Sequence, residues 1–259
     1  MARQALAQGF EAIIAVGGDG TVGEIVDGYL GAPELLRRRA VLGTVPVGSG
    51  CDLARYLGLR CDGESISEMI QRPRIRVLDA GAVDFKGPGG ASLRRYFINV
   101  AAFGLAGDVA RRVSARGKAW GGTLSYLLSS LAALAQAKAK PVDLIVDGVP
   151  SPRASYHLVV MANTSTFGGG MRVAPQADPE DGRLDLITVE EMSRWELVRR
   201  LPLIYTGRHM RLPGVGRRLV RRLEAKGDEA TFLNIDGEAL GMLPAIFEVL
   251  PKAVSFLSL

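Results

Sequence analysis

The sequence predicts two domains, an α/β domain over residues 1–75 and a mostly antiparallel β domain over residues 76–259. In the first part, short apolar segments alternate with segments of helical spacing, as they do in β-α-β-α units. From about Arg74 onward, apolar segments follow one another and are separated by Gly, Pro and Asp-Gly turn signals. The composition, with 47% hydrophobic and 23% charged residues, is typical of a globular protein that mixes strands and helices.

The first domain is predicted to contain two strands and two helices. The apolar segments EAIIAV (11–16) and AVLGTVPV (40–47) predict buried strands. TVGEIVDGYL (21–30) has helical spacing, and SGCDLARYLGL (49–59) starts with a serine that can cap a second helix. Because buried strands that are joined through helices run parallel, we expect a parallel sheet with helices on both faces.

The second domain is predicted to be mostly strands, interrupted by helices near 105–115, 123–137 and 195–205. The last strand of the chain is free to return to the first domain. The segments with strand character are 74–85, 94–104, 141–149, 155–165, 183–190, 230–240 and 245–251.

Composition and leader signals favour a cytoplasmic protein. The two cysteines, Cys51 and Cys61, make neither a disulfide framework nor a metal-binding CxxC pair. The N-terminal segment MARQALAQGF lacks the apolar core of a signal peptide. The apolar segment 123–137 is too short and too rich in Ser and Gln to span a bilayer.

Basic residues are concentrated in one part of the chain. The net charge is +5, and arginines crowd the segment 194–227. Such a cluster attracts the phosphates of lipid headgroups or of nucleic acid. A solvated basic face has the same composition, so the segment leaves both interpretations open.

The stretch VGGDGTVG (16–23) places a carboxylate among glycines where a strand gives way to a helix. Glycines at such a turn let backbone N–H groups approach a phosphate, and the start of the helix adds partial positive charge. Asp19 would repel a bare phosphate, so its presence is explained if a divalent cation lies between it and a nucleotide. The stretch therefore predicts a site for a magnesium–nucleotide complex.

Other interpretations of this loop are weaker. A P-loop is excluded, because no GxxxxGK[ST] occurs. Gly18, Gly20 and Gly23 match GxGxxG, but the next strand ends in PVGSG where a dinucleotide site needs an acidic residue. A tight Asp-Gly turn without a ligand remains open for this loop taken alone.

A second glycine cluster, PVGSGCDLAR (46–55), repeats the arrangement after the next strand, with the hydroxyl of Ser49 and the carboxylate of Asp52. Adjacent parallel strands deliver their following loops to the same edge of the sheet, where open α/β sheets bind ligands. The two loops together predict a binding site.

These motifs resemble those of the diacylglycerol kinase catalytic-domain family, which includes bacterial lipid kinases and sphingosine kinases. GGDGTVGEIVDG (17–28) looks like its nucleotide loop, and PVGSGCDLAR is similar to its PxGTxNDxAR segment. Four further segments occur in the family's order, namely LDAG, NVAAFGLAGDVA, FGGGMRVAPQADPEDGRLDL and NIDGEAL. The resemblance implies an ATP-dependent kinase of a lipid hydroxyl, with ATP in a cleft between the α/β domain and a β-sandwich domain.

The resemblance also assigns roles to residues. Asp19, Asp52 and Asp79 would organise the catalytic magnesium and its waters. Glu238 would be the general base that takes the proton of the lipid hydroxyl, a role that a positioned carboxylate can fill. Without the resemblance, NIDGEAL is better described as an Asp-Gly hairpin turn with an exposed glutamate. The residues that would bind ATP are Gly17, Gly18, Asp19, Gly20, Thr21, Val22, Gly23 and Ser49.

The segment ADPEDGRLDL (177–186) resembles the family's structural magnesium loop. In that loop Asp181 would contribute its side chain, while Asp178 and Arg183 would contribute mainly backbone oxygens. Local chemistry is equally typical of an Asp-Gly turn between two strands.

The chain also departs from the family pattern. The family usually has Asn, Thr and Asn where this chain has Gly23, Ser49 and Cys51. The family's first strand, with its NPxxG-like loop, does not precede Met1. We therefore expect an exposed apolar sheet edge, weak nucleotide binding and a partner at that edge, such as the second chain of a homodimer.

The expected partners are a lipid substrate and, transiently, an anionic membrane surface, with no nucleic acid. The basic and apolar segment 195–211 would touch the membrane, and an acyl pocket would be lined by 101–107 and 125–135. Rival functions are a kinase of a soluble hydroxylated substrate such as NAD and a non-catalytic lipid-binding protein. Against the former stand the PVGSGCDLAR and NIDGEAL segments.

Overall fold

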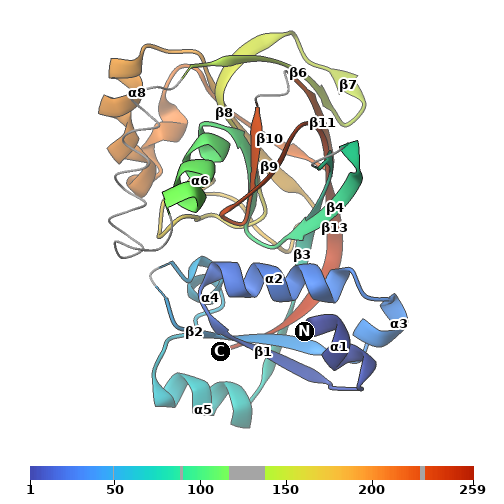
Figure 1. The fold of residues 1–259 in the computed structure, drawn as a ribbon. Coiled ribbons are helices and arrows are strands. Elements are labelled where there is room, and N and C mark those ends of the chain that lie inside the picture. Colours follow the sequence, from blue (N-terminus) through green and yellow to red (C-terminus); the bar gives the residue numbers. More distant parts are fainter. Residues whose placement is uncertain (49, 88–89, 117–137, 228–230) are drawn as a thin grey trace.

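The computed structural model describes residues 1–48, 50–87, 90–116, 138–227 and 231–259. Figure 1 shows two lobes, a smaller one formed by the N-terminal part of the chain and a larger β-rich one above it. The first lobe contains α1 (Ala2–Ala7), β1 (Ala12–Gly17), α2 (Asp19–Leu30), α3 (Glu34–Arg37), β2 (Val41–Pro46), α4 (Asp52–Tyr56) and α5 (Gly63–Gln71).

The sheet of the first lobe is mixed. Strands β1 and β2 pair in parallel, and the end of β13 (Glu238–Ser258) joins β2 in parallel where Phe256 lies opposite Leu42. Strand β3 (Arg74–Lys86) runs antiparallel to β13, so the sheet is not parallel throughout as expected. The reason is that β13 enters this sheet from the other lobe. Helix α2 covers one face of the β1–β2 pair and α5 the other (Figure 1).

Strand β1 forms the open side of this sheet. Among the described residues its one strand partner is β2. Ile14 and Val16 on β1 are 38% and 65% exposed, which is high for large apolar side chains. The expected apolar edge is therefore present.

The second lobe is an antiparallel array of strands with helices at its side. Strands β8, β5, β12, β13, β11 and β6 pair in that order, and β6 pairs back with the start of β8, so the array closes on itself. Strands β9 and β10 extend from the other edge of β8. Its elements are β4 (Ser92–Phe97), β5 (Val100–Gly104), α6 (Leu105–Arg116), β6 (Lys140–Val146), β7 (Val149–Pro150), β8 (Ala154–Ala162), β9 (Leu184–Glu190), α8 (Arg194–Arg200), η2 (Leu201–Thr206), η3 (Arg208–Arg211), β10 (Val215–Val220), β11 (Arg222–Lys226) and β12 (Phe232–Ile235).

The two lobes share a pair of long strands. Strands β3 and β13 pair from Lys86 opposite Met242 to Arg74 opposite Ser258, with register shifts along the way. The ribbon they form runs from the upper lobe into the lower one (Figure 1). The expected strand 245–251 is thus only the middle of a strand that begins at Glu238 and also includes the end of the predicted strand 230–240.

One other expectation about strands is corrected. The segment 94–104 is not one strand but two, β4 and β5, because the N–H groups of Ile98, Asn99 and Val100 donate to the Asp236 carboxylate. The second half of the basic segment 194–227 forms two strands that were not expected, β10 and β11. Within it, Arg217 pairs with Asp185.

Helices follow the expectations in part. Helix α6 covers the expected 105–115. The expected helix 195–205 is shorter, since α8 ends at Arg200 and 3-10 turns follow. The expected helix 123–137 lies outside the described residues. None of the described helices is long and apolar enough to cross a membrane.

The core of the second lobe depends on stacked aromatic rings. Phe247 is fully buried, and its ring lies 6.0 Å from that of Phe103, centroid to centroid. We predict that Phe247→Ala lowers the free energy of unfolding by about 3–5 kcal/mol, because it leaves a cavity. Phe10, 58% exposed ahead of β1, supplies the matched control. Phe10→Ala should change stability by no more than about 0.5 kcal/mol in the same urea titration. Equal midpoints for the two variants would contradict this account of the core.

Candidate functional site

The two glycine loops meet at the ends of β1 and β2. The Val47 N–H donates to the carbonyl of Gly17 at 3.1 Å. A side chain on Gly48 would come within 3.2 Å of the Gly18 Cα, so glycine is needed where the loops pass each other. The structure thus brings the two predicted loops together.

Asp19 joins these loops. It is the first residue of α2, and its Oδ1 accepts the N–H groups of Asp52 at 2.7 Å and Leu53 at 3.4 Å. It therefore caps α4 across 33 residues of sequence. Burial raises the pKa of Asp19, and the negative charge of Asp52 adds to that rise.

Asp52 is buried, and both oxygens of its carboxylate accept hydrogen bonds. Its Oδ1 accepts from Arg55 Nη1 at 2.6 Å, and its Oδ2 accepts from the N–H of Gly169 at 3.3 Å. Gly169 belongs to the second lobe, so this carboxylate lies where the two lobes meet.

The remaining residues expected to bind ATP differ in their exposure to solvent. Gly20 and Thr21 are exposed at the start of α2. Val22 is buried in the core of the first lobe, and its N–H donates to the Gly18 carbonyl. Gly23 lies against Asp236, whose Cβ would be 3.3 Å from a Gly23 side chain. Ser49 lies outside the described residues.

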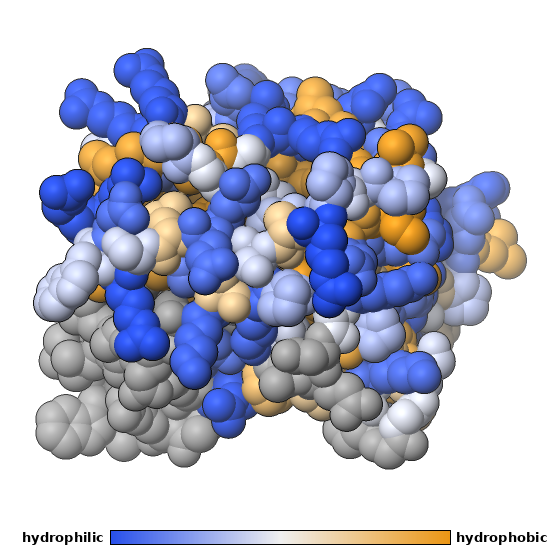
Figure 2. Space-filling view, turned by 90° about the horizontal axis from the view of Figure 1, so that it is seen from above, coloured by the Kyte–Doolittle hydropathy of each residue, from blue (hydrophilic) through white to orange (hydrophobic). Residues whose placement is uncertain are grey.

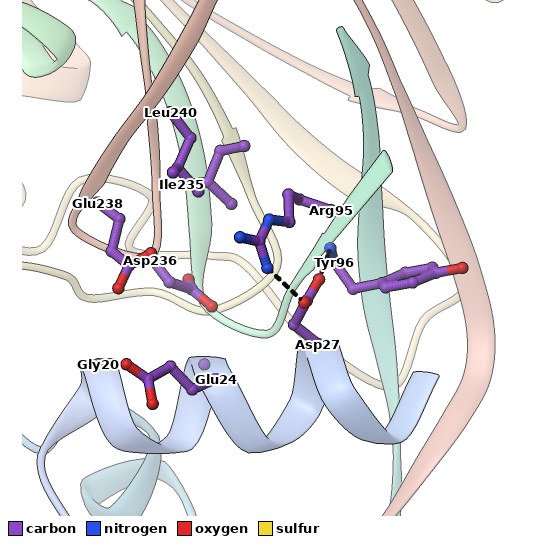
Figure 3. A pocket seen from close by; sticks show the side chains of 10 residues that line it. Gly20, Glu24, Asp27, Arg95, Tyr96, Ile235, Asp236, Glu238 and Leu240 are labelled. Carbon is purple, nitrogen blue, oxygen red and sulfur yellow. Dashed lines mark hydrogen bonds and ion pairs between the residues drawn. The ribbon is translucent and has the colours of Figure 1, made fainter. Parts of the chain in front are cut away.

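A small cavity lies between α2 and the turn from β12 to β13 (Figure 3). Its volume is about 30 Å³, which admits water or a single functional group but no acyl chain. The carboxylates of Glu238 and Glu24 face it from opposite sides, one from the turn and one from α2 (Figure 3). Its lining consists of Gly20, Gly23, Glu24, Asp27, Arg95, Tyr96, Ile235, Asp236, Glu238 and Leu240.

The side chain of Glu238 is exposed and has no ion-pair or hydrogen-bond partner among the residues that the structure describes. It follows Asp236 and Gly237, both with positive φ, in the turn expected from the Asp-Gly pair. The Asp-Gly hairpin turn that the sequence predicted for NIDGEAL is therefore present. It places Glu238 at the cavity (Figure 3).

Asp236 fixes this turn to the rest of the lobe. Its Oδ2 accepts from Ile98 N–H at 2.9 Å, and its Oδ1 accepts from Asn99 at 3.0 Å and Val100 at 2.9 Å. Burial raises the pKa of Asp236 to about 7, although the three N–H donors act in the opposite direction.

Asp27 also lines the cavity, and it hydrogen-bonds to two of the other lining residues, Arg95 and Tyr96. Its Oδ2 accepts from Arg95 Nη1 at 2.7 Å, and its Oδ1 accepts from the Tyr96 N–H at 3.0 Å. Asp27 is on α2 and the other two residues are on β4, so this contact links the lobes beside Glu238 (Figure 3).

Each oxygen of the Asp79 carboxylate accepts one backbone hydrogen bond. Its Oδ2 accepts from Gly182 N–H at 2.6 Å and its Oδ1 from Lys252 N–H at 2.7 Å. Asp79 is fully buried, and its bond from Gly182 fixes the loop 178–183 in place.

The loop expected to hold a structural magnesium is shaped by its own carboxylates. Asp178 Oδ1 accepts from Glu180 N–H at 3.1 Å, and Asp181 Oδ1 accepts from Arg183 N–H at 2.8 Å. Burial raises the pKa of Asp181, and the charges of Asp178 and Asp79 add to the rise. Within the described ranges no three His, Cys, Asp or Glu side chains gather around a metal position.

The acyl pocket expected along 101–107 and 125–135 stays a prediction. In its first half, Ala101, Ala102 and Phe103 are packed in the cores of the second lobe. The other half, 125–135, lies outside the described residues.

Sequence reasoning missed several residues of the cavity. Glu24 and Asp27 follow Gly20 at helical spacing, so they share its helix face, and that signal could have found them. Asp236 stands in the quoted NIDGEAL motif. Arg95 and Tyr96 carry no signal, because only the approach of β4 to α2 brings them to the cavity.

Two family models match the chain. The diacylglycerol kinase catalytic domain matches residues 1–83, and the YegS C-terminal NAD kinase beta sandwich-like domain matches residues 99–258. The expected β-rich second domain is thereby confirmed as sandwich-like.

Named relatives agree with these models. The chain is 31% identical over 247 residues to a diacylglycerol kinase of Bacillus subtilis (strain 168), covering 95% of this chain and 77% of that protein. It is 30% identical over 261 residues to a diacylglycerol kinase of Mycobacterium tuberculosis (strain ATCC 25618 / H37Rv), covering 98% and 78%.

Solved structures share the fold. A Bacillus anthracis str. Sterne diacylglycerol kinase has a TM-score of 0.68 at 17% identity, covering 100% of this chain and 80% of that one. An NAD kinase from Archaeoglobus fulgidus in complex with ATP has a TM-score of 0.57 at 16% identity, covering 98% and 79%. From the family models and the curated relatives, the chain belongs to the diacylglycerol kinase family and is a kinase with an alcohol group as acceptor.

Proposed function

We propose that the protein is an ATP- and magnesium-dependent lipid kinase that transfers the γ-phosphate of ATP to a lipid hydroxyl. The observation that carries this proposal is the unpaired carboxylate of Glu238, which faces a cavity beside Gly20 and Gly23 of the glycine-loop helix. ATP would lie along the two glycine loops, with its phosphates at the start of α2.

In the proposed reaction the hydroxyl oxygen of the lipid attacks the γ-phosphorus of ATP. A new P–O bond forms, and the bond from the γ-phosphorus to the bridging oxygen breaks, leaving its electron pair on ADP. Glu238 accepts the hydroxyl proton as attack proceeds. The small cavity suits the hydroxyl end of a lipid, and its acyl part would lie outside it.

The carboxylates at the loops fit a magnesium ion. Both oxygens of Asp52 already accept hydrogen bonds, whereas Asp19 Oδ2 has no donor among the described residues. Asp19 is half-buried beside Asp52, and a divalent cation would offset these two charges. Asp19 would hold the ion together with water and phosphate oxygens, as is usual for magnesium, which neutralises phosphate charge in such a reaction. Asp181, with backbone oxygens of Asp178 and Arg183, would hold a second, structural ion.

Asp236 supports the proposed base. Three backbone hydrogen bonds hold its carboxylate, and Glu238 is two residues further along the same turn. Its contact with Gly23 sets how close that turn approaches α2. Asp236 is therefore a positioning residue for Glu238.

We also propose transient contact with an anionic membrane through α8 and the turns after it. Trp195 is 85% exposed and Tyr205 52% exposed, beside Arg199. Arg200 pairs with Glu196 at 3.1 Å and contributes less free charge. The end of the second lobe is mostly hydrophilic with scattered apolar residues (Figure 2), which suits headgroup contact better than deep insertion.

The first prediction concerns the proposed base. Glu238→Gln should lower lipid phosphorylation by about 10²–10⁴-fold, because the amide cannot accept the hydroxyl proton. The measurement is transfer of labelled γ-phosphate from ATP to a panel of pure lipids, with NAD included as a soluble acceptor. Glu64→Gln on α5 is the control, since Glu64 is exposed and outside the cavity.

Each result of that assay bears on the proposal. Label on a lipid that disappears only in Glu238→Gln supports it. Label on NAD would favour the soluble-substrate kinase. Lipid binding without transfer would favour the non-catalytic binder.

The second prediction concerns the membrane. Arg199→Ala should weaken binding to vesicles containing anionic lipid about fivefold, because each arginine near such a surface contributes about 1 kcal/mol. Trp195→Ala should weaken it as well. The control is Arg38→Ala, at an exposed arginine that follows α3 in the other lobe. Co-sedimentation measures the binding, and indistinguishable curves for all four proteins would leave the basic segment as a solvated face.

The third prediction concerns pH. The pKa of Asp236 is about 7 in the folded protein, above the ordinary aspartate value of 3.8 that applies when the chain is unfolded. Between these two pH values the folded protein therefore binds a proton that the unfolded chain does not. The contribution of Asp236 to the free energy of unfolding is complete below about pH 4 and is lost as the pH rises through about 7. The free energy of unfolding should therefore fall less steeply over this range in Asp236→Asn than in the unmodified protein. Urea titrations across the range measure both slopes, and parallel slopes would rule out this contribution.

A further inference from the structure

The loop 167–171 of the second lobe has an unusual backbone. Gly168, Gly169 and Gly170 have φ values of 61°, 86° and 95°, a run that only glycines adopt without strain. Phe167 and Met171 close the loop by two hydrogen bonds of 3.0 and 3.1 Å between their backbones. The loop is therefore a defined turn whose shape requires its three glycines.

This turn lies against the loops of the first lobe. The Gly169 N–H donates to Asp52 Oδ2, and the Gly169 nitrogen would be 3.9 Å from a side chain on Gly50. Such a side chain on Gly50 would also touch the Asp19 carboxylate. The glycine turn thus faces the place where the Asp19–Asp52 pair and the second glycine loop meet.

Arg55 borders the same place. Its Nη1 donates to Asp52 Oδ1 at 2.6 Å and its Nη2 to the Gly50 carbonyl at 3.0 Å. A side chain on Gly170 would be 4.0 Å from Arg55 Nη1, so the guanidinium lies beside the turn. The Arg55 side chain is 53% exposed, and a guanidinium has five N–H donors, so several remain for a ligand.

The glycine turn and Arg55 together offer more N–H donors than the described residues around them accept. Among the described residues, the structure shows no acceptor for the N–H groups of Gly168 and Gly170. The bond from Gly169 to Asp52, at 3.3 Å, is longer than usual for N–H···O, so it is weak. Successive backbone N–H groups in such a turn form anion-binding concavities, and a guanidinium adds charge-assisted, bidentate bonds to phosphate.

We propose that Arg55 and the N–H groups of Gly168–Gly170 together bind the terminal phosphate of the nucleotide. This inference rests on the proposed kinase function. The terminal phosphate must reach Glu238, which the second lobe supplies, so it has to lie where the two lobes meet. The first-lobe loops hold the inner phosphates, and the glycine turn closes over the outer one from the opposite side.

The test compares binding of a non-hydrolysable ATP analogue with binding of ADP, by calorimetry with magnesium present. Arg55→Lys keeps a charge beside buried Asp52 but removes the planar fork, and Gly170→Ala distorts the turn. Each variant should weaken binding of the analogue about tenfold, the loss of one charge-assisted hydrogen bond, and leave ADP binding unchanged.

Matched controls separate this effect from general damage. Gly148→Ala places alanine at a φ of 82° with no atom within 4 Å, in the turn between β6 and β7. It carries similar backbone strain outside the site and should leave both ligands unaffected. Arg38→Lys, directly after α3, is the control for the arginine. Melting curves confirm that each variant is folded.

The possible outcomes are distinct. Equal losses for the analogue and for ADP, or no loss for either, in an unmodified protein that phosphorylates lipid would overturn the inference while the proposed function stands. An unmodified protein that binds neither nucleotide and transfers no phosphate would overturn both. A selective loss of analogue binding in Arg55→Lys and Gly170→Ala, absent from both controls, supports the inference.

Discussion

The antiparallel pairing of β3 with β13 is the constraint on which the arrangement of the site depends. Both strands run through both lobes, held together from Lys86 opposite Met242 to Arg74 opposite Ser258. Strand β13 begins at Glu238 beside the cavity and ends next to β2, where Phe256 lies opposite Leu42. One hydrogen-bonded ribbon thus joins Glu238 to the sheet that carries the glycine loops. A flexible linker would leave that separation variable, whereas a paired ribbon limits it.

Carboxylates that accept backbone N–H groups from distant segments hold the rest of the site. Asp236 binds three successive N–H groups 136 to 138 residues away, and Asp79 binds two, 103 and 173 residues away. Hydrogen bonds to an ionised acceptor in a buried place are stronger than those between neutral groups. These carboxylates hold the fold, whereas the side chain of Glu238 and Oδ2 of Asp19 accept no hydrogen bond from the described residues.

The same division explains which site predictions agree with the structure. The two glycine loops lie together because adjacent parallel strands must deliver them to one edge, and strand periodicity is readable from sequence. The family resemblance groups Asp79 with Asp19 and Asp52, and in the structure its oxygens accept hydrogen bonds from Gly182 and Lys252, so its role toward magnesium stays a prediction. Asp236 was not singled out, since a carboxylate that holds backbone N–H groups has no sequence signature that separates it from an ordinary turn residue.

The sequence by itself determined the features that depend on near neighbours. Apolar periodicity placed β1, β2 and α6, Asp-Gly turn chemistry placed the turn before Glu238, and the glycine spacing located the loops. Only the tertiary structure decided the break between β4 and β5, the strands within the basic segment and the meeting of Gly169 with Asp52. These features arise from contacts between segments far apart in the chain. Their energies come from pairing and burial in the folded state, which local propensity does not encode.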